Sequence, residues 1–137
     1  MQAPNVRVEN IEPILRVEDM RRSVRYYVEV LGFSEAEWGT EAFTHVAGDG
    51  GGGGIYLCRG AQGRGGAWVW VGVEDVRELH RVYRERGALI RGEPVNHPWA
   101  LEMQVEDPDG NVLLFGSEPE GAESETSEAS EAPEAKR

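Results

Sequence analysis

The sequence predicts an α+β fold of two βαβββ repeats that form curved mixed sheets around a cleft, with the helices on the outer face. The first observation is a repeated motif: Val17-Glu18-Asp19-Met20-Arg21 returns 56 residues later as Val73-Glu74-Asp75-Val76-Arg77. The second is that a short apolar strand precedes each copy, and a helical pattern follows it and ends near Gly32 or Gly87. Two copies indicate a duplicated supersecondary unit, because a solenoid needs at least three repeats.

The first repeat, about residues 11–59, follows a polar N-terminal arm, residues 1–10. Asp19 is expected to cap its helix. A run of six glycines and one aspartate, residues 48–54, lacks the lysine and the following helix of a phosphate-binding loop, so it is predicted to be a flexible hairpin tip. The predicted strands and helix of this repeat cover residues 11–17, 20–31, 33–38, 42–46 and 55–58.

The second repeat, about residues 67–116, follows a glycine-rich linker. In its first strand Val69 and Val71 share one face, while Trp68 and Trp70 share the other. Both faces are apolar, so we expect the helix to cover the valines and something else to cover the tryptophans. The predicted strands and helix of this repeat cover residues 68–73, 76–86, 88–91, 101–105 and 112–115.

Length and composition indicate one domain, residues 11–116, with an acidic tail, residues 117–137. The tail has seven glutamates, two basic residues and no large apolar side chain, so it is predicted to be disordered. A formal net charge of −11 argues against binding nucleic acid or an anionic membrane and favours a cationic ligand. No apolar run is long enough for a membrane span, so the expected location is the cytoplasm.

The sequence contains no recognisable catalytic constellation. The three histidines share no metal-ligand spacing, and the lone Cys58 is expected to be a small buried hydrophobe. Two carboxylates are of interest: Glu12 lies inside an apolar strand, and Glu102 alternates with Leu101 and Met103. They are either solvated edge charges or groups that hold a cation, which could be a metal or a basic ligand.

Six aromatic residues are candidates for contacting a planar ligand. For Trp68 and Trp70 the alternative is an ordinary core position, but two tryptophans on one face are large for the concave side of a small sheet. Trp99 lies in a loop beside Pro98, where it could close a site. The full set of candidate aromatic residues is Trp38, Phe43, Tyr56, Trp68, Trp70 and Trp99.

The segments Tyr26–Phe33 and Asp107–Asn111, together with the doubled βαβββ order, resemble the vicinal oxygen chelate superfamily of glyoxalases, dioxygenases and bleomycin-resistance proteins. Within it the chain most resembles the bleomycin-binding resistance proteins, through Leu31-Gly32-Phe33, Ala67–Val71 and Pro98-Trp99 with Glu102 downstream. The resemblance implies a homodimer whose subunits build the ligand pockets jointly.

The metal-dependent members of that superfamily place ligands at positions that correspond here to Glu12, Trp68 and Leu114. Tryptophan and leucine cannot bind a metal, so Glu12 is the only plausible ligand and no metal or other cofactor is expected. The resemblance therefore favours a protein that sequesters a planar cationic drug without catalysis. The alternative is a divalent-metal glyoxalase-like lyase or dioxygenase.

Overall fold

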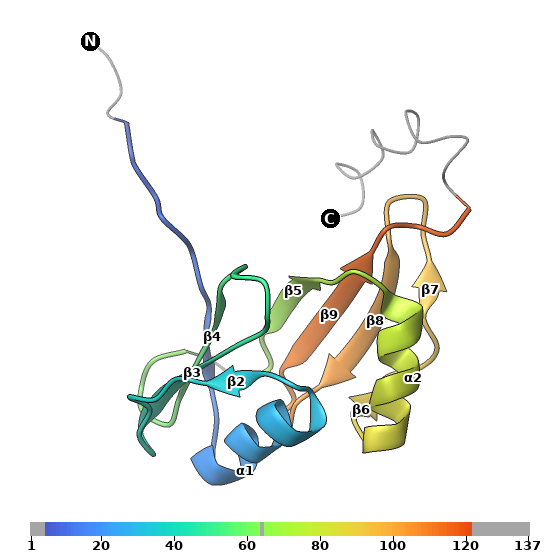
Figure 1. Ribbon diagram of the computed structural model, residues 1–137. Helices are drawn as coiled ribbons and strands as arrows, with labels where there is room; N and C mark the ends of the chain where they lie inside the picture. The colour runs from blue at the N-terminus through green and yellow to red at the C-terminus, as the bar shows by residue number, and fades with distance from the viewer. Residues whose placement is uncertain (1–4, 64, 122–137) are drawn as a thin grey trace.

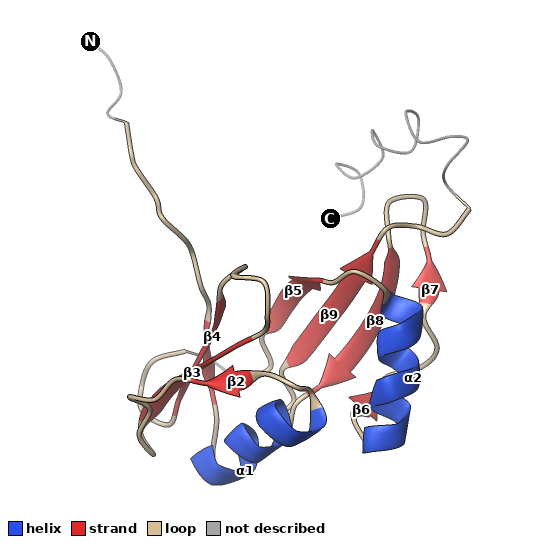
Figure 2. Ribbon diagram, viewed as in Figure 1, coloured by secondary structure: helices blue, strands red, loops and turns tan. Residues whose placement is uncertain are grey.

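The computed structural model describes residues 5–63 and 65–121 and has the predicted α+β architecture, with two mixed sheets and two main helices (Figure 1, Figure 2). The first sheet has the order β1-β4-β3-β2, in which β1 is parallel to β4. Its strands are β1 (Ile14–Arg16), β2 (Ser34–Glu35), β3 (Phe43–Ala47) and β4 (Gly54–Cys58).

The second sheet repeats this arrangement. Its order is β5-β9-β8-β6, in which β5 is parallel to β9, and the short β7 also pairs with β8. In both sheets the first strand of the repeat lies beside the last, as a duplicated unit requires. The strands are β5 (Trp68–Gly72), β6 (Leu89–Ile90), β7 (Val95–Asn96), β8 (Leu101–Glu106) and β9 (Val112–Ser117).

The helices begin where the repeated aspartates predict. Asp19 accepts a hydrogen bond from the Arg22 amide before α1 (Met20–Arg25), and Asp75 accepts one from the Glu78 amide before α2 (Val76–Arg86), each at 3.1 Å. The first predicted helix is not uniform, because it continues as the π-helical turn η1 (Tyr26–Val30). There the Leu31 amide donates to the Tyr26 carbonyl, five residues back.

Several strand boundaries differ from the prediction. The first strand is shorter, although its ladder continues at the Pro13 carbonyl, which accepts from the Tyr56 amide at 3.0 Å. The predicted strand 33–38 is reduced to β2, and the two-residue β7 was not predicted.

The start of the predicted acidic tail is packed on the body. Ser117 ends β9, and Glu120 forms an ion pair with Arg77 at 2.8 Å and a hydrogen bond with Asn96. The rest of that prediction, residues 122–137, lies outside the described residues.

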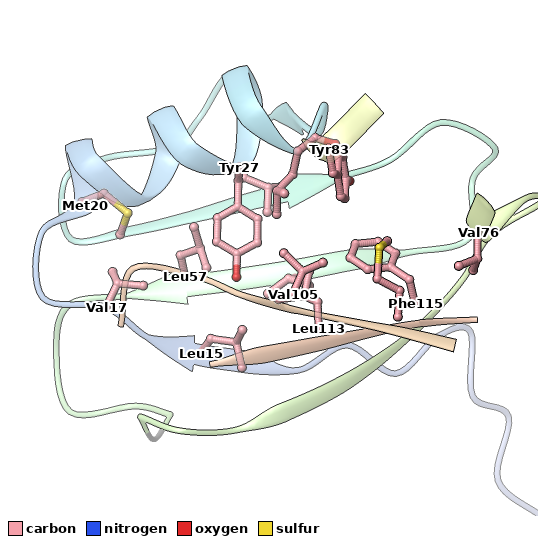
Figure 3. Close-up of a cluster of buried hydrophobic side chains, with 14 of the residues drawn as sticks. Leu15, Val17, Met20, Tyr27, Leu57, Val76, Tyr83, Val105, Leu113 and Phe115 are labelled. Atoms are coloured by element: carbon pink, nitrogen blue, oxygen red, sulfur yellow. The ribbon is translucent and has the colours of Figure 1, made fainter. Parts of the chain in front are cut away.

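One hydrophobic core joins the two repeats (Figure 3). Tyr27 and Leu57 from the first repeat lie in the same buried cluster as Val105, Leu113 and Phe115 from the second. The core lies on the helix side of each sheet, so the opposite sheet faces carry the remaining large side chains. No helix in the described part of the chain is long and apolar enough to cross a membrane.

Candidate functional site

The face of the second sheet that points away from the core carries two exposed tryptophans. Trp68 is 57% exposed and Trp70 is 46% exposed, whereas Val69 and Val71, which alternate with them, pack against the core. The expectation that β5 is covered on both faces is therefore wrong for the single chain. The alternative that these tryptophans are ordinary core residues is also wrong, because a core indole would be almost wholly buried.

Gly116 sets the position of Trp70. It lies opposite Gly72 on β9, and a Cβ atom built on Gly116 would overlap the six-membered ring of Trp70. The indole therefore lies over the backbone of β9 at Gly116, while about half of the surface of Trp70 remains accessible. Such a surface is suited to stacking with a planar ligand.

Trp68 lies beneath a charged side chain of the same sheet. The guanidinium carbon of Arg91 is 5.7 Å from the centre of the Trp68 ring, which is within cation–π range. Arg91 Nε also donates to Glu106 Oε2 at 3.2 Å. All three side chains are partly open to solvent.

Trp99 is held by Glu102 and His97. The Trp99 Nε1–H donates to Glu102 Oε2 at 3.2 Å, and the His97 ring stacks on Trp99 with centroids 4.7 Å apart and planes 3° apart. His97 Nε2 lies 3.6 Å from Glu102 Oε1. Glu102 is only 7% exposed as a whole residue. Of the two alternatives that the sequence allowed, a solvated edge charge is therefore wrong for Glu102.

The first sheet carries a second aromatic group on its own outer face. Phe43 and Tyr56 are stacked with centroids 5.2 Å apart, and Trp38 stacks on Phe43 at 6.1 Å. Trp38 is 55% exposed, so one end of this row is open. The strand alternation of β3 and β4 brings these rings to one face.

Glu12 lies beside this aromatic row, paired with His45. Its Oε1 is 2.5 Å from His45 Nε2, and the His45 ring lies 4.6 Å from Tyr56. A side chain larger than that of Gly54 would not fit here, because a Cβ atom would overlap the Val46 carbonyl oxygen and the imidazole. Glu12 is therefore also not a solvated edge charge.

The eight predicted residues thus lie in two groups, one on each sheet. The first contains Glu12, Trp38, Phe43 and Tyr56, and the second contains Trp68, Trp70, Trp99 and Glu102. Sequence reasoning missed three basic residues that contact these groups: His45, Arg91 and His97. Phe43 and His45 are two residues apart on one strand, so the sequence could have placed His45 on the same sheet face as Phe43. No pattern in the neighbouring sequence indicates the contacts of Arg91 and His97.

Two concave regions border these elements. A pocket of about 380 Å³ lies between the glycine-rich β3–β4 hairpin and β5, and Trp70 is one of the residues that line it. A larger groove of about 570 Å³ lies between α1 and residues 35–41, and it contains none of the eight predicted residues. We therefore place the candidate site at the tryptophan faces rather than at the larger groove.

The donor set does not fit a catalytic metal. Residues 5–63 and 65–121 contain no group of three or more histidine, cysteine, aspartate or glutamate side chains that could hold an ion. Glu12 pairs with His45, and the other two positions at which the metal-dependent members of the superfamily place ligands are Trp68 and Leu114, which offer no ligand atom.

The sequence and the fold are both similar to known proteins. Residues 7–115 match the model of the glyoxalase/bleomycin resistance protein/dioxygenase superfamily. No curated protein sequence matches the chain significantly.

Among solved structures, TnmS3, an antibiotic-binding protein from Streptomyces sp. CB03234, has a TM-score of 0.73 at 24% identity, covering 83% of this chain and 99% of its own. A glyoxalase/bleomycin resistance protein from the same organism has a TM-score of 0.68 at 26% identity, covering 77% and 97%. The bleomycin-binding protein of Streptomyces verticillus, solved with copper(II)-bleomycin, has a TM-score of 0.67 at 22% identity, covering 82% and 98%.

Proposed function

The chain belongs to the glyoxalase/bleomycin resistance protein/dioxygenase superfamily, and from this premise we propose that it is a metal-free binding protein that sequesters a planar, positively charged small molecule of the bleomycin type. In this role no bond is made or broken, and protection is stoichiometric. The observation that carries the proposal is the exposure of Trp68 and Trp70 on the outer face of β5.

Exposed indoles on a rigid strand favour a planar ligand for a physical reason. Trp70 is supported by the backbone of Gly116, so stacking on it would require little further ordering of the protein. A large aromatic ring contributes both apolar area and about 0.5–1.5 kcal/mol of stacking energy beyond that area.

The charge of the candidate site favours a cation. Glu12 and Glu102 are largely buried carboxylates beside the two aromatic groups, and the whole chain has a formal net charge of −11. A cation near a carboxylate in a partly desolvated site is attracted more strongly than in bulk water. We assign ligand contact to the eight residues that the sequence singled out, with stacking by the aromatic rings and charge recognition by the two glutamates.

A homodimer is part of the proposal. The two aromatic groups lie on different sheets, and a second copy could bring the first group of one chain opposite the second group of its partner. The structures named above are similar in fold, and one is an antibiotic-binding protein and another a bleomycin-binding protein.

The proposal is tested with Trp70→Ala and Trp99→Ala, titrated with bleomycin by calorimetry. Each truncation is expected to weaken binding by roughly 1–3 kcal/mol, by analogy with base–aromatic stacking. Trp70 is half exposed, so its removal should lower stability by less than the roughly 3–5 kcal/mol of a core tryptophan.

Val82→Ala on α2 is the matched control, because Val82 packs on the core away from the tryptophan face. It should lower stability and leave the affinity per folded molecule unchanged. If the wild type binds no such drug, or if both tryptophan variants lose only stability, the sequestration proposal is wrong. One metal ion per chain in protein purified without chelator would favour the lyase or dioxygenase alternative instead.

A further inference from the structure

The proposed ligand-contacting rings are not bare in this structure, because three of them already carry a basic side chain of the same chain. Arg91 lies over Trp68, His97 stacks on Trp99, and His45 lies against Tyr56. Each of these bases also faces a carboxylate: Glu106, Glu102 and Glu12, respectively. An aromatic ring, a planar base and a carboxylate thus recur three times on the outer sheet faces.

The Arg91 set follows from the chemistry of a planar cation. A guanidinium is flat, so it can stack on a ring face while its N–H groups point sideways to a carboxylate. A compact ammonium group cannot make both contacts in the same way. Trp68 together with Glu106 is therefore a recognition element for a planar delocalised cation, and this chain fills it with its own Arg91.

The three sets differ in how readily they could open. Measured on the side chains alone, the His45–Glu12 pair is 20% and 12% exposed, and the His97–Glu102 pair is 33% and 8% exposed. Arg91 and Glu106 are 44% and 39% exposed. Exposed ion pairs and exposed cation–π contacts are both weak, so the Arg91 set is the one that an external ligand can open most easily.

We propose that Arg91 is an internal stand-in for the ligand, and that a planar guanidinium or amidinium group of the ligand displaces it from Trp68 and Glu106. This inference rests on the proposed function and narrows the ligand class from cations in general to compounds that carry such a group. The exchange concerns the Arg91 set alone.

The test uses benzamidine and benzylamine, which share a phenyl ring and a positive charge but differ in the shape of the cation. Binding is followed by the indole N–H signals of the four tryptophans in two-dimensional NMR spectra, with the Trp68 signal assigned by Trp68→Phe. Benzamidine is expected to shift the Trp68 signal at a lower concentration than benzylamine. In Arg91→Gln the dissociation constant for benzamidine should fall about threefold or more, because the internal competitor is gone.

Arg81→Gln is the matched control, since Arg81 on α2 is an exposed arginine with its own ion pairs to Glu78 and Glu85. It removes the same charge and should change the benzamidine affinity less than twofold. Arg91→Lys, which keeps the charge and loses the planar group, should give an affinity between those of the wild type and Arg91→Gln.

The inference is overturned if Arg91→Gln binds benzamidine no more tightly than Arg81→Gln does, or if the Trp68 signal does not move in either variant. A bleomycin titration of the wild type separates this result from the proposed function. If the wild type does not bind bleomycin but Arg91→Gln binds benzamidine more tightly than Arg81→Gln does, only the proposal of drug sequestration is rejected. If the wild type binds bleomycin but the two variants bind benzamidine equally, only the role of Arg91 is rejected.

Discussion

Two glycines determine where the aromatic side chains of the candidate site can lie. Gly116 lies under Trp70, and Gly54 lies beside the ring of His45. A Cβ atom at Gly116 would overlap the Trp70 ring, so a larger residue would displace that ring. A Cβ atom at Gly54 would overlap both the Val46 carbonyl oxygen and the His45 ring. Neither glycine has a positive φ, so glycine is not required at these positions by the backbone conformation. It is required because it has no side chain.

Gly116→Ala is expected to displace the Trp70 indole and to weaken ligand binding. The new methyl group would overlap the ring, and moving it should lower the free energy of unfolding by about 1–3 kcal/mol, as in other overpacked sites. The displaced indole would become more exposed, which should shift its fluorescence emission to longer wavelength and raise its accessibility to acrylamide.

Gly52→Ala is the control for this prediction. Gly52 has no neighbouring atom within 4 Å of a built Cβ atom and no positive φ, so alanine fits there without strain. If Gly116→Ala and Gly52→Ala have the same stability and the same fluorescence, the packing of Trp70 on β9 is not as described.

At the scale of elements, the turn after β8 connects the two repeats. Asp107 is 1% exposed and accepts hydrogen bonds from the Tyr27 hydroxyl at 2.9 Å and from the Asn111 side chain at 2.9 Å. The Asn111 amide group also donates to the Arg16 carbonyl, and Asp109 accepts from the Glu18 amide. The turn therefore holds the first strand and first helix against the second sheet.

Tyr27→Phe tests this connection. Burial and the nearby Asp107 carboxylate raise the pKa of Tyr27 well above its ordinary value, so its hydroxyl remains a hydrogen-bond donor. Removing it leaves the buried Asp107 carboxylate with one donor fewer, which is expected to lower the free energy of unfolding by about 1.5–3 kcal/mol. Denaturant unfolding gives this value directly.

Tyr56→Phe provides the comparison, because the Tyr56 hydroxyl makes no hydrogen bond within the described ranges 5–63 and 65–121. It should change stability by less than about 0.5 kcal/mol. Equal effects of the two substitutions would contradict the role assigned to the turn.

The sequence predicted the elements where a local signal exists. The two aspartate caps, the glycine that ends α2 and the alternation along β5 all operate within a few residues, so they could be recognised without the fold. The π-helical turn and β7 have no such signal. β7 exists because Val95 and Asn96 reach the edge of β8, and that contact depends on the chain path between them.

The same distinction applies to the candidate site. Strand parity correctly placed Trp68 and Trp70 on the face opposite the valines. It could not show that Arg91 covers Trp68 or that His97 covers Trp99, because these contacts depend on side-chain conformations and on strands that come together only in the folded sheet. Whether the eight residues bind a ligand remains a prediction.

At the scale of the whole molecule, several large apolar side chains outside the core are exposed to solvent. Val6, Val8 and Ile11 are 77%, 56% and 86% exposed, and the segment 5–11 that carries them extends away from the two sheets (Figure 1). Trp38, Trp68 and Trp70 are also about half exposed on the sheet faces. A monomeric protein rarely leaves large contiguous apolar patches in water, so a partner surface is expected to cover part of this area.

The expected partner is a second copy of the chain, in a two-fold symmetric dimer. Sedimentation equilibrium at micromolar concentration should therefore give twice the chain mass of 15.2 kDa. Each chain has a formal net charge of −11, so raising the salt concentration should strengthen association by screening the repulsion between two acidic chains.

Deleting residues 1–9 should weaken the dimer if Val6 and Val8 contact the partner. Deleting residues 122–137 should leave association unchanged or slightly stronger, because this deletion removes negative charge and no large apolar side chain. A monomer mass at tens of micromolar in high salt would contradict the dimer, and it would also reject a ligand pocket built jointly by the aromatic groups of two chains.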